Sequence, residues 1–214
     1  MASAWKWTPS SKLCFVTTGA TAPFTALIES VLSASSLDAL LEKGYTHLLV
    51  QYGSAKDVYT TASTIARSYV QDRLIIDGID FNPDGLHAQL RLVQQSKGLT
   101  ISHAGSGSIL EALRYQIPLV VVPNTSLLDN HQEELAVAME RSGYLLQGHV
   151  EYVSSGSFVG VSLLTAFRRD LGPAIRKSEE FRTKMSQFPP ITSGKHRETK
   201  SFATIMDETV GFMD

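Results

Sequence analysis

The sequence predicts an α/β fold built on a doubly wound, mostly parallel β-sheet. Five short aliphatic runs are each followed by a longer amphipathic stretch, which is the pattern of strands joined by helical crossovers. The runs are almost wholly apolar rather than alternating, as expected for strands that helices cover on both faces. The chain has 214 residues, 43% of them hydrophobic, which is enough to bury such a core without disulfides or metals.

The expected strands cover residues 13–17, 46–51, 73–76, 99–102 and 119–122. The expected helices follow them at residues 24–32, 58–69, 86–95, 109–115 and 132–141. The connections between them are rich in Gly, Ser, Asn and Pro, which favour turns and loops. This alternation predicts a single parallel sheet with helices packed on its two faces.

The distribution of charge indicates three parts along the chain. Residues 1–167 are mildly acidic and form the expected α/β domain, whereas residues 168–200 hold nine Lys and Arg against four Asp and Glu. This basic segment is expected to end in a linker, because Pro189 and Pro190 break any helix there. Residues 201–214 are expected to form an amphipathic helix that docks on its own domain or on a partner. Its apolar side consists of Phe202, Ile205, Met206, Val210 and Met213.

Composition excludes several classes of protein. The formal net charge of −2 argues against a generic polyanion binder, so no nucleic-acid partner is expected. The single cysteine, Cys14, excludes an internal disulfide and is expected to be a small buried hydrophobe. The start of the chain has no apolar run resembling a secretory signal, and the longest aliphatic strand run, Leu119 to Val122, is far shorter than the roughly 20 residues of a membrane helix. We therefore expect a soluble, cytosolic protein.

Three loops that follow expected strands carry candidate ligand groups, because ligands of open parallel sheets bind beyond the carboxyl ends of the strands. The first loop runs from Thr17 to Thr21 and includes Thr18 and Gly19, whose small size lets backbone N–H groups approach an anion. It matches neither the Walker loop nor the GxGxxG pattern. Its alternative interpretation is an ordinary strand-to-helix turn.

The second loop joins a buried strand to a helix that is expected to begin near Ile109. It runs from Ser102 to Ser108 and contains His103, Gly105, Ser106 and Gly107, and Glu111 follows in the helix. Two glycines and three serines at a helix N-terminus supply N–H and hydroxyl donors for a diphosphate. Glu111 has the chemistry to accept two ribose hydroxyls, but Ser108 and Glu111 also have the spacing of a capping box that needs no ligand.

The third loop runs from Pro123 to Gln132 and is rich in amides. Asn124, Asp129, Asn130 and Gln132 offer groups suited to the neutral hydroxyls of a sugar. The alternative is that Asp129 is the N-cap of the next helix with Gln132 as its capping partner, which leaves Asn124, Asn130 and His131 unexplained. A phosphate cradle beside a sugar-sized polar loop predicts a nucleotide-sugar site.

These loops resemble those of a known family. The run SHAGSGSILEALRYQIPLVVVPNTSLLDNHQEELA, from Ser102 to Ala136, resembles the signature of the Alg-thirteen proteins of glycosyltransferase family 28, and more distantly the carboxy-terminal half of the bacterial MurG transferases. The similarity extends through VTTGATAPF and LLVQYGSA and covers residues 13–146.

The resemblance implies the Rossmann-like, nucleotide-sugar-binding half of a GT-B glycosyltransferase. It implies inverting β-1,4 transfer of N-acetylglucosamine from UDP-N-acetylglucosamine to GlcNAc-diphosphate-dolichol, the second step of lipid-linked oligosaccharide synthesis, with no metal and no cofactor. It also implies a membrane-anchored partner that binds the lipid-linked acceptor and recruits this subunit to the cytosolic face of the endoplasmic reticulum. The alternative is a non-catalytic nucleotide-binding or scaffolding module, which the basic segment and the apolar C-terminal face suggest.

The resemblance also implies roles for individual residues. Thr18, Gly19, His103, Gly105 and Ser106 would lie at the diphosphate, Glu111 would accept from the ribose, and residues 79–81 with Phe81 would border the uracil. Asp129, Asn130 and Gln132 would face the N-acetylglucosamine. His103 stands where MurG has an arginine, so phosphate binding would depend more on backbone donors and the helix dipole. No catalytic base is assigned; His103 and His131 are the fallback candidates.

Overall fold

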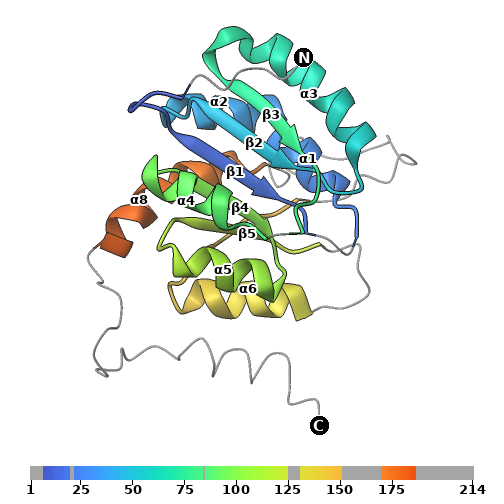
Figure 1. Cartoon of the computed structure of the whole chain (residues 1–214). Coiled ribbons are helices and arrows are strands. Elements are labelled where there is room, and N and C mark those ends of the chain that lie inside the picture. Colours follow the sequence, from blue (N-terminus) through green and yellow to red (C-terminus); the bar gives the residue numbers. More distant parts are fainter. Residues whose placement is uncertain (1–6, 20–21, 84, 125–130, 151–169, 187–214) are drawn as a thin grey trace, which may run out of the picture.

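The computed structural model describes residues 7–19, 22–83, 85–124, 131–150 and 170–186 (Figure 1). Its strands are β1 (Leu13–Thr17), β2 (His47–Gln51), β3 (Ile75–Ile79), β4 (Leu99–His103), β5 (Leu119–Val122) and β6 (Leu146–Gln147). Its helices are α1 (Thr25–Val31), α2 (Ala34–Glu42), α3 (Lys56–Val70), α4 (His87–Gln95), α5 (Ser106–Arg114), α6 (His131–Arg141) and α8 (Gly172–Ser186), with a 3-10 turn at Gln71–Arg73.

The six strands form one parallel sheet in the order β3-β2-β1-β4-β5-β6, which is the Rossmann order. The predicted doubly wound parallel sheet is therefore confirmed. Because β1 pairs with both β2 and β4, the chain first builds the sheet outward on one side and then returns to build the other side. All strand arrows point the same way, so the loops that follow them gather at one edge (Figure 1).

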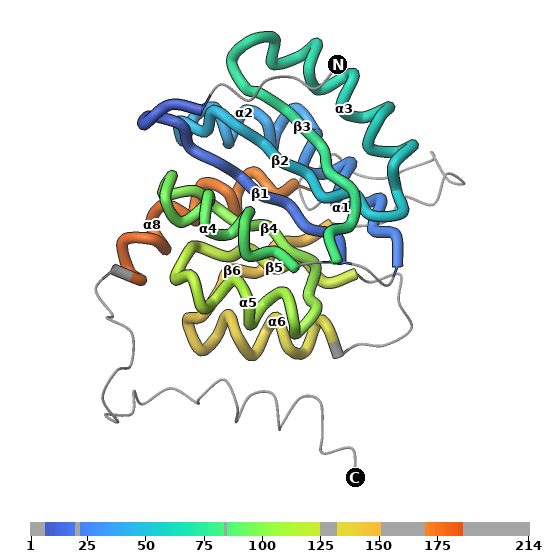
Figure 2. The backbone as a smooth tube through the Cα atoms, in the orientation of Figure 1, coloured from blue at the N-terminus to red at the C-terminus, as the bar shows by residue number. Residues whose placement is uncertain are grey.

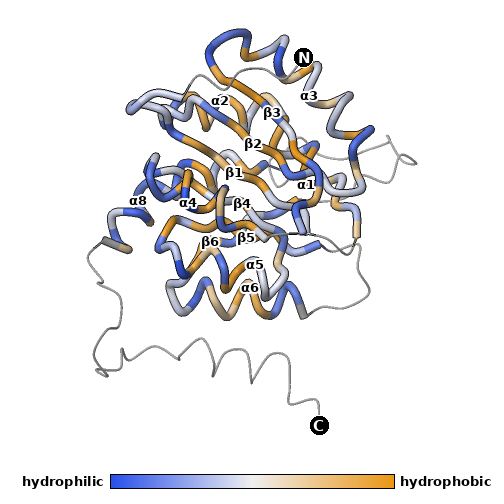
Figure 3. The backbone as a smooth tube through the Cα atoms, in the orientation of Figure 1, coloured by the Kyte–Doolittle hydropathy of each residue, from blue (hydrophilic) through white to orange (hydrophobic). Residues whose placement is uncertain are grey.

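Alternate side chains of β1 belong to two different cores. Cys14 and Val16 pack with α1, α2, α3 and α8, whereas Leu13 and Phe15 pack with α4, α5 and α6. All four side chains are fully buried, which is why the strand is apolar at every position. The hydrophobic segments in Figure 3 accordingly lie mainly in the central strands. The predicted burial of Cys14 is confirmed.

Two elements differ from the sequence prediction. Strand β3 lies two to three residues later than expected, because Arg73 belongs to the 3-10 turn and the strand continues through Gly78. A Cβ on Gly78 would lie 2.3 Å from ring atoms of Tyr59, so this glycine makes room for an α3 side chain. Helix α2 was not predicted, because its serine-rich start reads as a loop. Ser33 caps it by accepting a hydrogen bond from the backbone N–H of Ser36.

Helix α8 joins the α/β body, although the charge pattern assigned residues 168–200 to a separate basic segment. Ile175 of α8 is fully buried in the core that contains α1, α2 and α3. The Glu179 carboxylate also accepts hydrogen bonds from Lys12 Nζ and Tyr45 Oη, both at 2.9 Å. The expected linker and the expected helix at residues 201–214 lie outside the described residues. Within the described ranges, no helix is both long and apolar enough to cross a membrane.

Candidate functional site

The loops after β1 and β4 meet at the point where the strand order reverses. The chain leaves β1 toward helix α1 on one face of the sheet and leaves β4 toward helix α5 on the other face. In open α/β sheets this divergence opens the crevice in which ligands bind. Gly19 from the first loop meets His103 and Gly105 from the second here. Thr18 directly precedes Gly19, and its hydroxyl donates to the backbone carbonyl of Gln51.

The His103 side chain fills the space between the two loops. A Cβ on Gly19 would lie 2.5 Å from His103 Nε2, and a Cβ on Gly105 would lie 2.2 Å from the same atom. Gly19 also has φ +79°, a left-handed conformation that disfavours other residues. Both glycines are therefore needed to let the backbone of each loop approach the Nε2 end of the ring.

Burial of the His103 ring favours its neutral form. It lowers the pKa of the imidazole below its usual value near 6.5, and the backbone of Thr17 opposes this shift only in part. The Nδ1 atom is buried and has no hydrogen-bond partner among the residues that the structure describes. The ring is thus neutral at neutral pH, and an anion bound beside it would favour the protonated form.

The N-terminus of helix α5 lies at the second loop, beside His103. Gly105 is its N-cap and provides no side-chain cap, so the first-turn N–H groups of Ser106, Gly107 and Ser108 have no acceptor within the helix. Together with the helix dipole, they form a site suited to an anion. The helix begins three residues earlier than predicted. The capping-box alternative for Ser108 and Glu111 is therefore wrong, because both residues lie inside the helix.

Glu111 connects α5 to the start of α4. Its Oε1 accepts a hydrogen bond from the backbone N–H of Leu86 at 3.0 Å and lies 3.5 Å from His87 Nδ1. The side chain is 20% exposed, so the carboxylate remains within reach of a ligand. Glu111 follows the second loop, as predicted, but its hydrogen bond to the backbone of Leu86 was not predicted from the sequence.

Phe81 lies after β3 with an exposed ring. The side chain is 48% exposed, and the Asp80 carboxylate accepts the Phe81 N–H at 2.6 Å. The chain then runs into α4, as Figure 2 traces, and Leu86 reaches the Glu111 carboxylate. The segment predicted to border the uracil is therefore joined to helix α5, which follows the second loop, by the hydrogen bond between Leu86 and Glu111.

The third loop is described only at its two ends. Asn124, which is 5% exposed, donates its backbone N–H to Gln132 Oε1 at 3.1 Å. Gln132 therefore ties the end of β5 to the start of α6. Asp129 and Asn130 lie outside the described residues, as does the side chain of His131, although α6 begins at that residue.

Gln51 is a site-proximal residue that the sequence analysis missed. It ends β2, is 1% exposed, and accepts the Thr17 hydroxyl hydrogen at 2.6 Å through Oε1. Its backbone carbonyl accepts the Thr18 hydroxyl hydrogen at 3.1 Å. The sequence does contain an indication of this role, because Gln51 is a polar residue that directly follows the apolar residues Leu48 to Val50 at the end of the strand where ligands bind.

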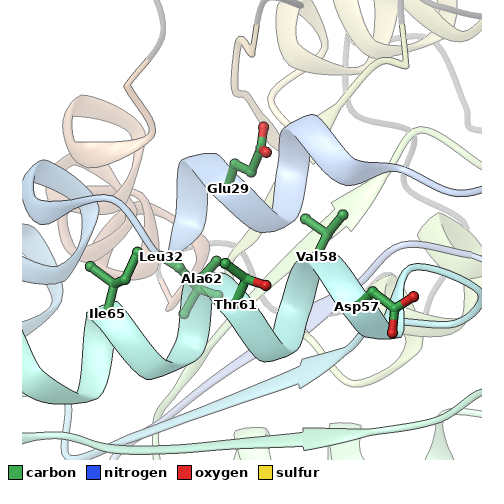
Figure 4. A pocket seen from close by; sticks show the side chains of 7 residues that line it. All are labelled: Glu29, Leu32, Asp57, Val58, Thr61, Ala62 and Ile65. Atoms are coloured by element: carbon green, nitrogen blue, oxygen red, sulfur yellow. The ribbon is translucent and has the colours of Figure 1, made fainter.

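A hollow of about 510 Å³ lies apart from these loops, between α1 and α3 (Figure 4). Its walls are mainly apolar, with one acidic side chain on each helix. The lining residues are Glu29, Leu32, Asp57, Val58, Thr61, Ala62 and Ile65. None of the predicted site residues is among them, so this hollow is separate from the crevice at the sheet edge.

Comparison with known proteins connects this geometry to a family. The model of the glycosyltransferase family 28 C-terminal domain matches residues 13–155. Two relatives are named UDP-N-acetylglucosamine transferase subunit ALG13. The Eremothecium gossypii protein is 38% identical over 63% of this chain and 73% of its own length, and the Saccharomyces cerevisiae protein is 35% identical over 63% of this chain and 76% of its own length. The Mus musculus protein of the same name is 35% identical over 63% of this chain, which corresponds to only 10% of the mouse protein.

Two solved structures have a similar fold. The NMR structure of ALG13 matches with a TM-score of 0.51 and 26% identity, over 84% of this chain and 97% of that one. The crystal structure of Acinetobacter baumannii MurG matches with a TM-score of 0.51 over 83% of this chain and 46% of that one, and at 17% identity it supports the fold alone. The resemblance noted in the sequence is confirmed, and this chain belongs to glycosyltransferase family 28, whose C-terminal domain its residues 13–155 form.

Proposed function

We propose that this protein is the donor-binding subunit of a transferase that moves N-acetylglucosamine from UDP-N-acetylglucosamine to GlcNAc-diphosphate-dolichol. The observation that carries the proposal is the convergence of Gly19, His103 and the uncapped N-terminus of α5 at the switch point of the sheet. Relatives at 35% and 38% identity are named as UDP-N-acetylglucosamine transferase subunits, which supports this donor.

In this proposal the diphosphate lies against Thr18, Gly19, His103 and the first turn of α5, where Gly105 to Ser108 supply backbone N–H groups. Glu111 accepts the ribose hydroxyls, and the exposed Phe81 ring borders the uracil. The third loop contacts the N-acetylglucosamine through Asn124, Asp129, Asn130 and Gln132.

The proposed reaction is an inverting displacement. The acceptor 4-hydroxyl forms a bond to the anomeric carbon while the bond from that carbon to the diphosphate breaks, and UDP leaves with the electron pair. The negative charge that develops on the leaving diphosphate is stabilised by the N–H groups and dipole of α5. The acceptor subunit is proposed to supply the base that takes the hydroxyl proton.

The acceptor is proposed to bind to a membrane-anchored partner subunit, which holds this protein at the cytosolic face of the endoplasmic reticulum. The word subunit in the names of the relatives supports a complex. Membrane association then comes from the partner.

Ligand-induced thermal stabilisation tests the donor site. At a UDP-N-acetylglucosamine concentration 100 times Kd, the stability of the protein should rise by about 2.7 kcal/mol, which corresponds to roughly 5–10 °C for a chain of this size. A Glu111→Gln variant should keep the Leu86 hydrogen bond through its amide oxygen, and therefore its melting temperature without ligand. Its amide N–H₂ cannot accept from the ribose, so the shift with ligand should shrink.

A matched control is Glu180→Gln, which changes an exposed glutamate on α8 away from the crevice. This control should keep the full shift. A wild-type protein that is not stabilised by millimolar UDP-N-acetylglucosamine, either alone or with the partner subunit, would overturn the proposed donor.

A further inference from the structure

Gln51 makes two hydrogen bonds to the residues that lead into the first loop. Its Oε1 accepts from Thr17 Oγ1 at 2.6 Å, and its backbone carbonyl accepts from Thr18 Oγ1 at 3.1 Å. The Gln51 side chain is almost fully buried, as are both threonines. A single residue at the end of β2 therefore restrains both of the residues that precede Gly19.

The restraint passes from Thr17 to the backbone of Gly19. Because the Thr17 hydroxyl donates its hydrogen to Gln51, its oxygen is left to accept from the Gly19 N–H, which lies 3.4 Å away. Gly19 is the residue whose backbone approaches the Nε2 end of His103. The orientation of the Thr17 hydroxyl thus affects where the first loop lies relative to the ring.

Stability alone does not account for an amide at this position. The Gln51 Nε2 atom is buried with no hydrogen-bond partner within the described part of the chain. An unsatisfied buried donor destabilises the folded state, and an apolar side chain of similar shape would avoid that cost. An apolar residue would also continue the pattern of the preceding strand residues, Leu48 to Val50.

We propose that Gln51 is a positioning residue for the donor diphosphate. It touches no substrate; it orients the Thr17 hydroxyl, which holds the Gly19 backbone against His103 in the arrangement that receives the phosphate oxygens. This inference rests on the proposed function, since it assigns Gln51 to the same UDP-N-acetylglucosamine site.

The test compares Gln51→Met, Thr17→Val and the double variant with Thr100→Val as control. Thr100 lies in β4 of the same sheet, is 1% exposed, and has a buried hydroxyl without a partner among the described residues. It pairs with Phe15 in the middle of β1 rather than with Thr17. Melting temperature without ligand and Kd for UDP-N-acetylglucosamine are measured on the full chain. KM and kcat are measured on the complex with its membrane subunit.

We expect Gln51→Met to melt close to the wild type while its Kd and KM for the donor rise tenfold or more. Because Gln51 acts through Thr17, the double variant should bind no more weakly than the weaker single variant. Thr100→Val should leave Kd unchanged. If Gln51→Met binds the donor as the wild type does, or if the two losses add, the inference is overturned while the proposed function stands. If the wild type itself does not bind the donor, both are overturned.

Discussion

Replacing Gly105 by alanine tests the close packing between the second loop and His103. Gly105 has φ −79°, which alanine adopts without strain, so any cost must come from the added methyl group. That Cβ would lie 2.2 Å from His103 Nε2 and 3.0 Å from Cδ2 and Cε1. The Gly19 backbone also approaches Nε2, which limits the room into which the ring can retreat. Overpacking of this kind costs about 1–3 kcal/mol.

The midpoint of this range, about 2 kcal/mol, should lower the melting temperature by roughly 4–8 °C, measured by circular dichroism. Gly107→Ala is the matched control, since the space around its Cβ position is empty among the described residues and alanine favours the helix by about 0.5–1 kcal/mol. In a His103→Ala background, Gly105→Ala should lose its cost, which gives a measurable coupling energy. Equal effects of the two glycine variants, or no coupling to His103, would show that Gly105 is not packed closely against the imidazole.

Three further predictions concern titration and reactivity. Burial lowers the pKa of His103, and a bound diphosphate would raise it, so calorimetry should show tighter UDP-N-acetylglucosamine binding as the pH falls from about 8 to 6. The affinity of His103→Gln should not change over this range, and a wild-type affinity that does not change with pH would contradict the prediction. Partial burial acts to raise the pKa of Glu179, but the hydrogen bonds and positive charges of Lys12 and Arg182 outweigh burial, so this pKa is lowered. Glu179→Gln should therefore lower the free energy of unfolding by about 1–2 kcal/mol at pH 7. This loss, measured by urea unfolding, should shrink as the pH falls from about 4.3, the ordinary pKa of a glutamate, through the lower pKa of Glu179 in the folded protein. A loss that does not change with pH would contradict the prediction. Burial raises the pKa of the Cys14 thiol, so it should react with a thiol reagent only after denaturation, and rapid native labelling would disprove its inaccessibility.

Periodicity predicted most of the α/β body because each strand is buried on both faces. The apolar run at residues 13–17 was sufficient to locate β1 to the residue. Helix α2 was not predicted because the serines at its start favour loops. In the structure Ser33 caps the helix, and the burial of Leu37 and Leu40 holds it against the core. Helix α8 was not predicted because charged residues stand beside its apolar positions, and some of them, such as Glu179 with Tyr45, contact the body rather than solvent.

The first and second loops of the predicted site lie together in the structure, but the contacts that hold them there were not predicted. The rule that ligand loops follow parallel strands was enough to bring Gly19 and His103 into one crevice. The hydrogen bond from Leu86 to Glu111 and the one from Thr17 to Gln51 join residues 25 and 34 positions apart. Such contacts depend on the three-dimensional packing of neighbouring elements, which the local pattern of one sequence does not contain.

The proposed function requires that this chain supplies the donor site of a UDP-N-acetylglucosamine transferase. The most direct measurement is transfer of labelled N-acetylglucosamine from UDP-N-acetylglucosamine to a GlcNAc-diphosphate lipid, by membranes that contain the acceptor subunit together with either the wild-type chain or His103→Ala. We predict transfer with the wild-type chain, and a large loss of transfer with the variant at equal amounts of folded protein. Transfer that does not depend on this chain, or no transfer by the assembled wild-type complex, would contradict the claim.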